Sequence, residues 1–175
     1  LLANQTVTGT FTVAGNSAIN RILVQSDTLG TARTITAATV SCSNVDFMDI
    51  TGAGAGSWNL AAITGLSGDC GGNTGITFTT ASAQTHTTSA GGNWSDSTKW
   101  TSRVPLPQDD VTVNGNTSGT LTVDMPRLGR DITLTGFSGT LALSGTISTF
   151  TSYGSVTLSS GMTFTGTGTY AVGGR

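Results

Sequence analysis

The feature that most constrains this chain is a series of very short alternating strands in its last third. Segments of roughly three residues carry apolar side chains on either side of a Thr or Ala. Strand starts recur about every 10 residues and pairs of strands about every 20, a period typical of a solenoid. We expect coils whose inward apolar side chains stack on the same positions of the next coil, with Thr and Ser outside. The predicted strands are 111–113, 121–123, 132–134, 141–143, 156–158, 162–164 and 170–172.

The first 80 residues show the same alternation of apolar and polar residues, at less regular intervals. Short alternating stretches recur, and Gly, Asn, Asp and Ser separate them as turn formers do. The predicted strands carry the pairs Phe11/Val13, Ile22/Val24, Ile35/Ala37, Val40/Cys42, Val45/Phe47 and Ile76/Phe78. Residues 51–64 are rich in Gly and Ala and are expected to form a loop.

The sequence therefore predicts an all-β protein built from right-handed parallel β-helix coils. A β-sandwich or jelly roll is the alternative, because it also shows strands every 8 to 12 residues or so. The short strands, the Thr-rich outward positions and the scarcity of tight hairpin turns favour the β-helix.

Three regions are expected. Residues 1–80 are coils that end a preceding repeat, and residues 111–175 are coils of the next repeat. Between them, residues 81–110 combine a polar linker, 81–90, with a segment that holds Trp94 and Trp100. We expect these two tryptophans to form an aromatic cap on the end of the following β-structure. The first residue is not Met, and we expect the chain to be part of a longer polypeptide.

Composition argues against two classes of function. Only 9% of the residues are charged, the net charge is -2, and the few Arg residues are scattered, so no surface for nucleic acid is expected. No stretch approaches the ~18 apolar residues of a membrane span, so membrane insertion is not expected either.

Cys42 and Cys70 are the only cysteines. They could form a disulfide that closes a loop of about 28 residues. Equally, they could be two buried thiols that act as small apolar side chains. They do not form a Cys-x-x-Cys pair, so structural zinc is not expected. We predict no metal and no cofactor.

Catalytic chemistry finds little support in the sequence. His86 is the only histidine and lies in the expected linker, which holds the geometry of a catalytic triad poorly. The pairs Asp46/Asp49 and Asp109/Asp110 could serve glycoside hydrolysis, but neighbouring strand residues point to opposite faces, so capping of turns is the preferred interpretation. We predict no catalytic residue and no enzymatic activity.

Two binding roles are weaker candidates. Asp69 or Asp109 could bind calcium in an oxygen-rich turn. The aromatic residues could form a platform for a glycan, although plugging and lining the solenoid is the preferred interpretation. These aromatic residues are Trp58, Trp94, Trp100, Tyr153 and Tyr170.

The segment Gly92-Asn93-Trp94-Ser95-Asp96, followed by Trp100, Val104-Pro105 and Asp109-Asp110, resembles a module of large bacterial surface proteins and tailed-phage structural proteins. In that module a G-N-W-S-D…W segment leads into a right-handed β-helix. Residues 137–164 look like the coils that follow, and residues 44–50 and 71–78 like the last coil of a preceding copy. The resemblance implies a phage or bacterial surface context and carries no catalytic residues.

The expected function is a non-enzymatic structural segment on a virion surface, in a fibre, spike or capsid decoration. Its expected partners are other virion or surface proteins and further copies of itself, a trimer by analogy with fibres, with a glycan as a further candidate. A bacterial adhesin or extracellular filament subunit is the first alternative, and a β-helix enzyme that degrades polysaccharide is the second.

Overall fold

The computed structural model describes residues 1–173, which form two compact units, one of Leu1–Thr80 and one that begins at Ala81. Both consist of short β-strands and loops, and among the described residues the only helical element is a 3-10 turn, η1 (Ser97–Lys99). The protein is therefore all-β. In this part of the chain no helix has the length and apolar character needed to cross a membrane.

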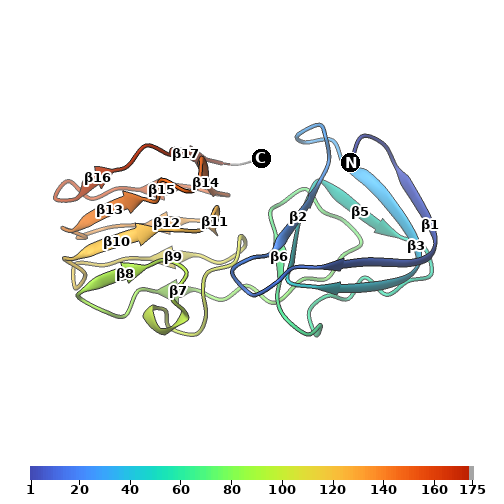
Figure 1. Ribbon diagram of the computed structural model, residues 1–175, viewed down its shortest axis with the longest axis horizontal. Coiled ribbons are helices and arrows are strands. Elements are labelled where there is room, and N and C mark those ends of the chain that lie inside the picture. The colour runs from blue at the N-terminus through green and yellow to red at the C-terminus, as the bar shows by residue number, and fades with distance from the viewer. Residues whose placement is uncertain (174–175) are drawn as a thin grey trace. The chain divides into compact units, whose positions relative to one another are not determined.

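The first unit contains two three-stranded sheets, β1-β3-β5 and β2-β4-β6. Consecutive strands enter the two sheets alternately, and all neighbours within a sheet are parallel (Figure 1). Each strand therefore pairs with the next-but-one strand along the chain. The strands are β1 (Gln5–Ala14), β2 (Ile22–Gln25), β3 (Arg33–Ser43), β4 (Val45–Met48), β5 (Ile50–Ala53) and β6 (Ser67–Asp69).

Single residues turn the chain from one of these sheets to the other. Asn44 lies between β3 and β4 with φ 46°, and Asp49 lies between β4 and β5 with φ 53°. Asn and Asp tolerate this left-handed region better than other non-glycine residues. The Asn44 amide donates to the Gly15 carbonyl and accepts from the Leu66 amide N–H, so it joins the corner to the segments on both sides.

The core of the first unit lies between its two sheets. It contains the buried residues Ile35, Ala37, Cys42, Val45, Phe47, Ile50, Trp58 and Leu60. The predicted strands at Ile35/Ala37 and Val40/Cys42 are one strand, β3, whose pairing with β1 shifts register between Val7 and Thr10. Such an irregularity changes the phase of the alternation, which is why the sequence pattern looks like two strands. The predicted strand at Ile76/Phe78 provides only isolated bridges.

The second unit contains three sheets with the orders β7-β9-β12-β15, β8-β10-β13-β16 and β11-β14-β17. From β9 onward the chain adds one strand to each sheet in turn and then repeats, and the strands stack in Figure 1 from β7 and β8 to β16 and β17. The strands are β7 (Gln84–Thr85), β8 (Gly91–Asn93), β9 (Val111–Thr112), β10 (Thr120–Val123), β11 (Arg127–Gly129), β12 (Ile132–Thr133), β13 (Thr140–Leu143), β14 (Thr149–Ser152), β15 (Val156–Thr157), β16 (Thr163–Thr165) and β17 (Thr169–Val172).

Apolar side chains in register form ladders through the second unit. The registers place Val111, Ile132 and Val156 in one ladder, Leu121, Leu141 and Phe164 in another, and Phe150 and Tyr170 in a third. The flanking Thr residues of each strand point to the opposite face because side chains alternate along a strand. The members of earlier coils are buried, and those of the last coil are partly exposed.

Every pair of strands in the described sheets is parallel. A β-sandwich or jelly roll is built from antiparallel strands joined by hairpins and Greek keys. That alternative is therefore wrong for this chain. The spacing of the strands was compatible with both folds, because strand spacing carries no information on which strands pair.

The expectation of a linker at residues 81–90 also needs correction. This segment contains β7, which pairs with β9, and Gln84 within it is fully buried. The Gln84 side chain donates to the Ser82 carbonyl and Ser102 Oγ, and it accepts from the amide N–H groups of Ser102 and Arg103. A polar segment can thus be buried when its side chains find partners, so residues 81–110 belong to the second unit.

The ladder of Leu121 provides a test of this packing. Leu121 is 0% exposed and lies in register with Leu141. Leu121→Ala is expected to lower the free energy of unfolding by about 2–5 kcal/mol, because it leaves a cavity in the coil interior. Thr122→Ala, on the opposite face of the same strand, is expected to cost less than about 1 kcal/mol. Urea unfolding followed by tryptophan fluorescence measures both, and equal losses would contradict the assigned faces.

Candidate functional site

The first pair of candidate carboxylates is engaged in structural contacts. Asp46 Oδ1 lies 2.7 Å from Arg21 Nε, and both side chains are 0% exposed. The Arg21 guanidinium also donates to the Ala18 carbonyl. Asp49 Oδ2 accepts from the Gly30 amide N–H at 2.8 Å. The two carboxylates therefore bind different partners within the fold.

The second pair is divided between the interior and the surface. Asp109 is buried, lies 2.6 Å from the Arg103 guanidinium, and accepts from the amide N–H groups of Ser82 and Leu106. Asp110 is partly exposed and lies 2.7 Å from Arg130. The two carboxylates, which directly precede β9, therefore have different surroundings. Asp109 thus connects three parts of the segment that precedes the regular coils.

Neither of the candidate calcium ligands is part of a ligand cluster. Asp69 Oδ1 accepts from the Gly71 amide N–H and from Asn73 Nδ2 in its own turn, and Asp109 faces Arg103. Within residues 1–173, no three His, Cys or Asp side chains lie close enough together to hold a metal ion.

Trp94 and Trp100 lie together at the end of the second unit where β7 and β8 are the first strands. Both are buried, their ring centroids are 4.8 Å apart, and Trp100 Nε1 donates to the Trp94 carbonyl at 2.7 Å. Trp94 follows β8 directly, and its amide N–H donates to the Thr122 carbonyl of β10. The turn η1 connects the two tryptophans, with Asp96 as its N-cap. We call this pair the aromatic cap.

Backbone pairing covers β7 at the same end of the unit. The Thr87 amide N–H donates to the Lys99 carbonyl, and the Thr101 amide N–H donates to the Thr85 carbonyl. His86 and Trp100 form an antiparallel bridge between these bonds. The segment that carries Trp100 therefore covers the outer edge of β7 with antiparallel hydrogen bonds, which leaves that edge unavailable to another strand.

His86 is part of this end and not of a linker. It is 2% exposed, and its ring stacks edge-on against Trp100 at 5.3 Å. Thr117 Oγ1 lies 3.0 Å from His86 Nδ1 and 3.0 Å from the Thr88 carbonyl oxygen, so the threonine hydroxyl bridges the imidazole and the backbone. His86 Nε2 is buried, and no hydrogen-bond partner for it is found among the described residues.

These surroundings disfavour the charged form of the imidazole. Burial lowers the pKa of His86, the nearby Lys99 charge lowers it further, and a hydrogen bond to the Thr88 backbone opposes both effects. No carboxylate orients His86, since its Nδ1 partner is a hydroxyl. The contacts are those of a packed core histidine.

The two cysteines and Trp58 are also buried. Cys42 and Cys70 are both buried free thiols, the second of the two alternatives that the sequence left open. Burial raises the pKa of the Cys42 thiol, which keeps it protonated. Trp58 is buried against Phe11 and Phe47. Buried tryptophans cannot stack on a sugar, so they do not form the glycan platform considered above.

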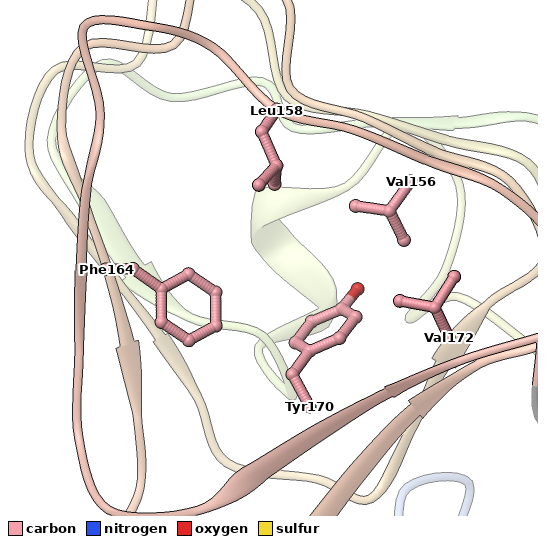
Figure 2. Close-up of a pocket in the computed structure, with 5 residues that line it drawn as sticks. All are labelled: Val156, Leu158, Phe164, Tyr170 and Val172. Atoms are coloured by element: carbon pink, nitrogen blue, oxygen red, sulfur yellow. The ribbon is translucent and has the colours of Figure 1, made fainter.

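The opposite end of the second unit is a hollow lined with apolar side chains. Figure 2 shows Val156, Leu158, Phe164, Tyr170 and Val172 directed into one space inside the last coil. The Phe164 and Tyr170 rings meet edge-on at 5.9 Å. Burial raises the pKa of the Tyr170 phenol, and a hydrogen bond with Ser152 opposes this. The sequence predicted these strands, but its alternating pattern did not indicate that their apolar side chains line a hollow.

The two neighbouring aspartates allow a matched test. Asp109→Asn is expected to lower the free energy of unfolding by about 3 kcal/mol, because Arg103 then lacks its buried counter-charge. Asp110→Asn breaks a partly exposed pair and is expected to cost less than about 1 kcal/mol. Chemical unfolding of the two variants measures the difference. A larger loss for Asp110→Asn would contradict the structural role assigned to Asp109.

His86 predicts a loss of stability in acid. Its pKa in the folded state is lower than the value of 6.5 expected when unfolded, so the unfolded chain binds the proton more readily. Stability is therefore complete above pH 6.5 and falls as the pH decreases below it, by at most about 1.4 kcal/mol per pH unit for one proton. The variant His86→Phe is expected to lose this dependence just below pH 6.5. Urea unfolding at a series of pH values checks it, and an unchanged pH profile would contradict the assignment.

Comparison with known proteins gives no relative for this chain. No protein-family profile matches it, and neither the curated proteins nor the solved structures contain a significant match.

Proposed function

We propose that this chain is a non-enzymatic structural segment of right-handed parallel β-helix coils on the surface of a tailed-phage virion. It would form part of a fibre, a spike or a capsid decoration. The observation that carries the proposal is the repeated addition of one strand to each of three parallel sheets, with apolar ladders inside the second unit.

This architecture suits a role that depends on shape. Backbone hydrogen bonds between coils run along the stack, so a short repeat builds a long and rigid body. Lys occurs once and Arg is scarce, so sites for trypsin-like proteases are few. The charged side chains support the same role, because Asp46, Asp109 and Asp110 are each paired with an Arg within the chain.

The virion context is supported by the sequence resemblance. Trp94 and Trp100, which belong to the G-N-W-S-D…W motif, lie at the start of the regular coils, as that motif does in phage and bacterial surface proteins. The proposed partners are other virion or surface proteins, further copies of the chain and, in contact with a host, a glycan. The same resemblance supports a bacterial adhesin or filament subunit as the second candidate.

Immunogold electron microscopy separates the two candidates. An antibody against residues 111–175 would be applied to source material that contains both cells and particles. Label on capsids or tails is the expected result and would identify the part of the particle that the chain builds. Label confined to cell envelopes or free filaments would overturn the virion assignment in favour of the bacterial surface protein. Preimmune serum provides the control.

A further inference from the structure

The connection from β9 to β10 contains a turn with the sequence Asn114-Gly115-Asn116-Thr117. Asn114 is the one asparagine of the sequence that is followed directly by glycine. Gly115 and Asn116 are exposed, whereas Thr117 is 0% exposed. Asparagine is a chemically labile residue. The turn therefore places a labile side chain and a solvent-accessible glycine next to a buried threonine.

The side chain of Asn114 folds over the peptide bond that follows it. Asn114 Oδ1 accepts from the Asn116 amide N–H at 3.0 Å, and the Asn114 carbonyl accepts from the Thr117 amide N–H at 3.1 Å. A side-chain turn of this kind closes a ring of atoms that includes Asn114 Cγ and the Gly115 amide nitrogen. The donor on Oδ1 also stabilises the negative charge that develops there when a nucleophile attacks Cγ.

The Gly115 amide nitrogen is the nucleophile that this arrangement offers. Within residues 1–173 its N–H donates no hydrogen bond, and Gly115 has no side chain to obstruct the approach to Cγ. Asn116 lies in the same turn but is followed by Thr117, which is β-branched and buried, and whose amide N–H is already bonded. The two asparagines therefore differ in the nitrogen that can attack them.

We propose that Asn114 is a site of spontaneous deamidation, with water as the co-reactant. The Gly115 amide nitrogen loses its proton to solvent hydroxide and attacks Asn114 Cγ. A C–N bond forms, the Cγ–Nδ2 bond breaks, and Nδ2 takes up a proton from water and leaves as ammonia. Water then opens the cyclic imide, and no group is oxidised or reduced. Hydrolysis of the bond to Cγ leaves an aspartate, and hydrolysis of the bond to the main-chain carbonyl carbon leaves an isoaspartate.

The isoaspartate changes the main chain beside the aromatic cap. It inserts a methylene group into the main chain after the Asn114 Cα, and the carbonyl that accepts from the Thr117 amide N–H becomes part of a free carboxylate. Thr117 Oγ1 lies 3.0 Å from His86 Nδ1 and 3.0 Å from the Thr88 carbonyl oxygen. Displacement of Thr117 breaks this bridge, so the modification is expected to loosen the packing of His86.

Peptide mass spectrometry of the whole chain, after incubation at mildly alkaline pH, tests the proposal. The expected result is a gain of mass at Asn114 equal to the replacement of NH by O, together with labelling by an isoaspartate-specific methyltransferase. Asn114 is expected to react at least about tenfold faster than Asn116, which corresponds to a barrier lower by about 1.4 kcal/mol. Asn116 is the internal control, because it belongs to the same turn and is also exposed to solvent.

Two variants separate the chemistry from the fold. Asn114→Ser retains a side-chain oxygen for the Asn116 amide N–H but has no amide to lose, so it is expected to gain no mass at this position. Gly115→Ala obstructs the attacking nitrogen and is expected to slow the reaction at least about tenfold. Its Cβ would lie 3.1 Å from the Gly136 carbonyl oxygen, so a shift of a few tenths of an ångström accommodates it. Far-UV circular dichroism verifies that both variants are folded.

Several results would overturn the proposal. These are an absence of reaction at Asn114, equal rates at Asn114 and Asn116, or a folded Gly115→Ala variant that reacts as fast as the unaltered chain. Anion exchange separates the isoaspartate form, which carries an additional carboxylate, and its urea midpoint is expected to be lower. An unchanged midpoint would reject the effect on His86. The virion role is decided separately by the immunogold experiment, since the reaction at Asn114 does not depend on it.

Discussion

The rest of this structure depends on backbone hydrogen bonding between strands that lie a whole coil apart. The backbone N–H and C=O groups of a parallel strand cannot bond to a strand that follows through a tight turn. They bond instead to a strand that the chain reaches only after a long connection. The register Leu121↔Leu141↔Phe164 shows the result, since the same bonds that satisfy the backbone also stack the apolar side chains. A slip by one residue would put these side chains on the outside and Thr inside.

Charged and amide side chains form hydrogen bonds with the backbone in the corners and segments that lie outside the regular strands. Asn44 and Asp49 make the corners of the first unit, and Asp109 and Gln84 hold the segment that precedes the coils of the second. Only 9% of the residues are charged, and several of them take part in these contacts within the fold. The aspartates that the sequence offered as paired catalytic groups form ion pairs and hydrogen bonds within the fold, which agrees with a structural role.

Packing differs between the two ends of the second unit. At one end antiparallel hydrogen bonds cover β7 beside two buried tryptophans, and at the other Phe164 and Val172 are exposed. The buried cluster of the two tryptophans also contains His86, the only histidine of the sequence.

The sequence by itself determined the all-β class and most of the short strands. It also indicated that Trp94 and Trp100 act together. Alternation and β-branched residues are local signals, and they state which side chains share a face. Only the tertiary structure decided that β7 lies within the expected linker, that Arg127–Gly129 forms β11, and that Arg21 pairs with Asp46. The physical reason is distance along the chain. A parallel strand takes its partner from a distant part of the sequence, as Asp46 takes Arg21, and no local pattern contains that partner.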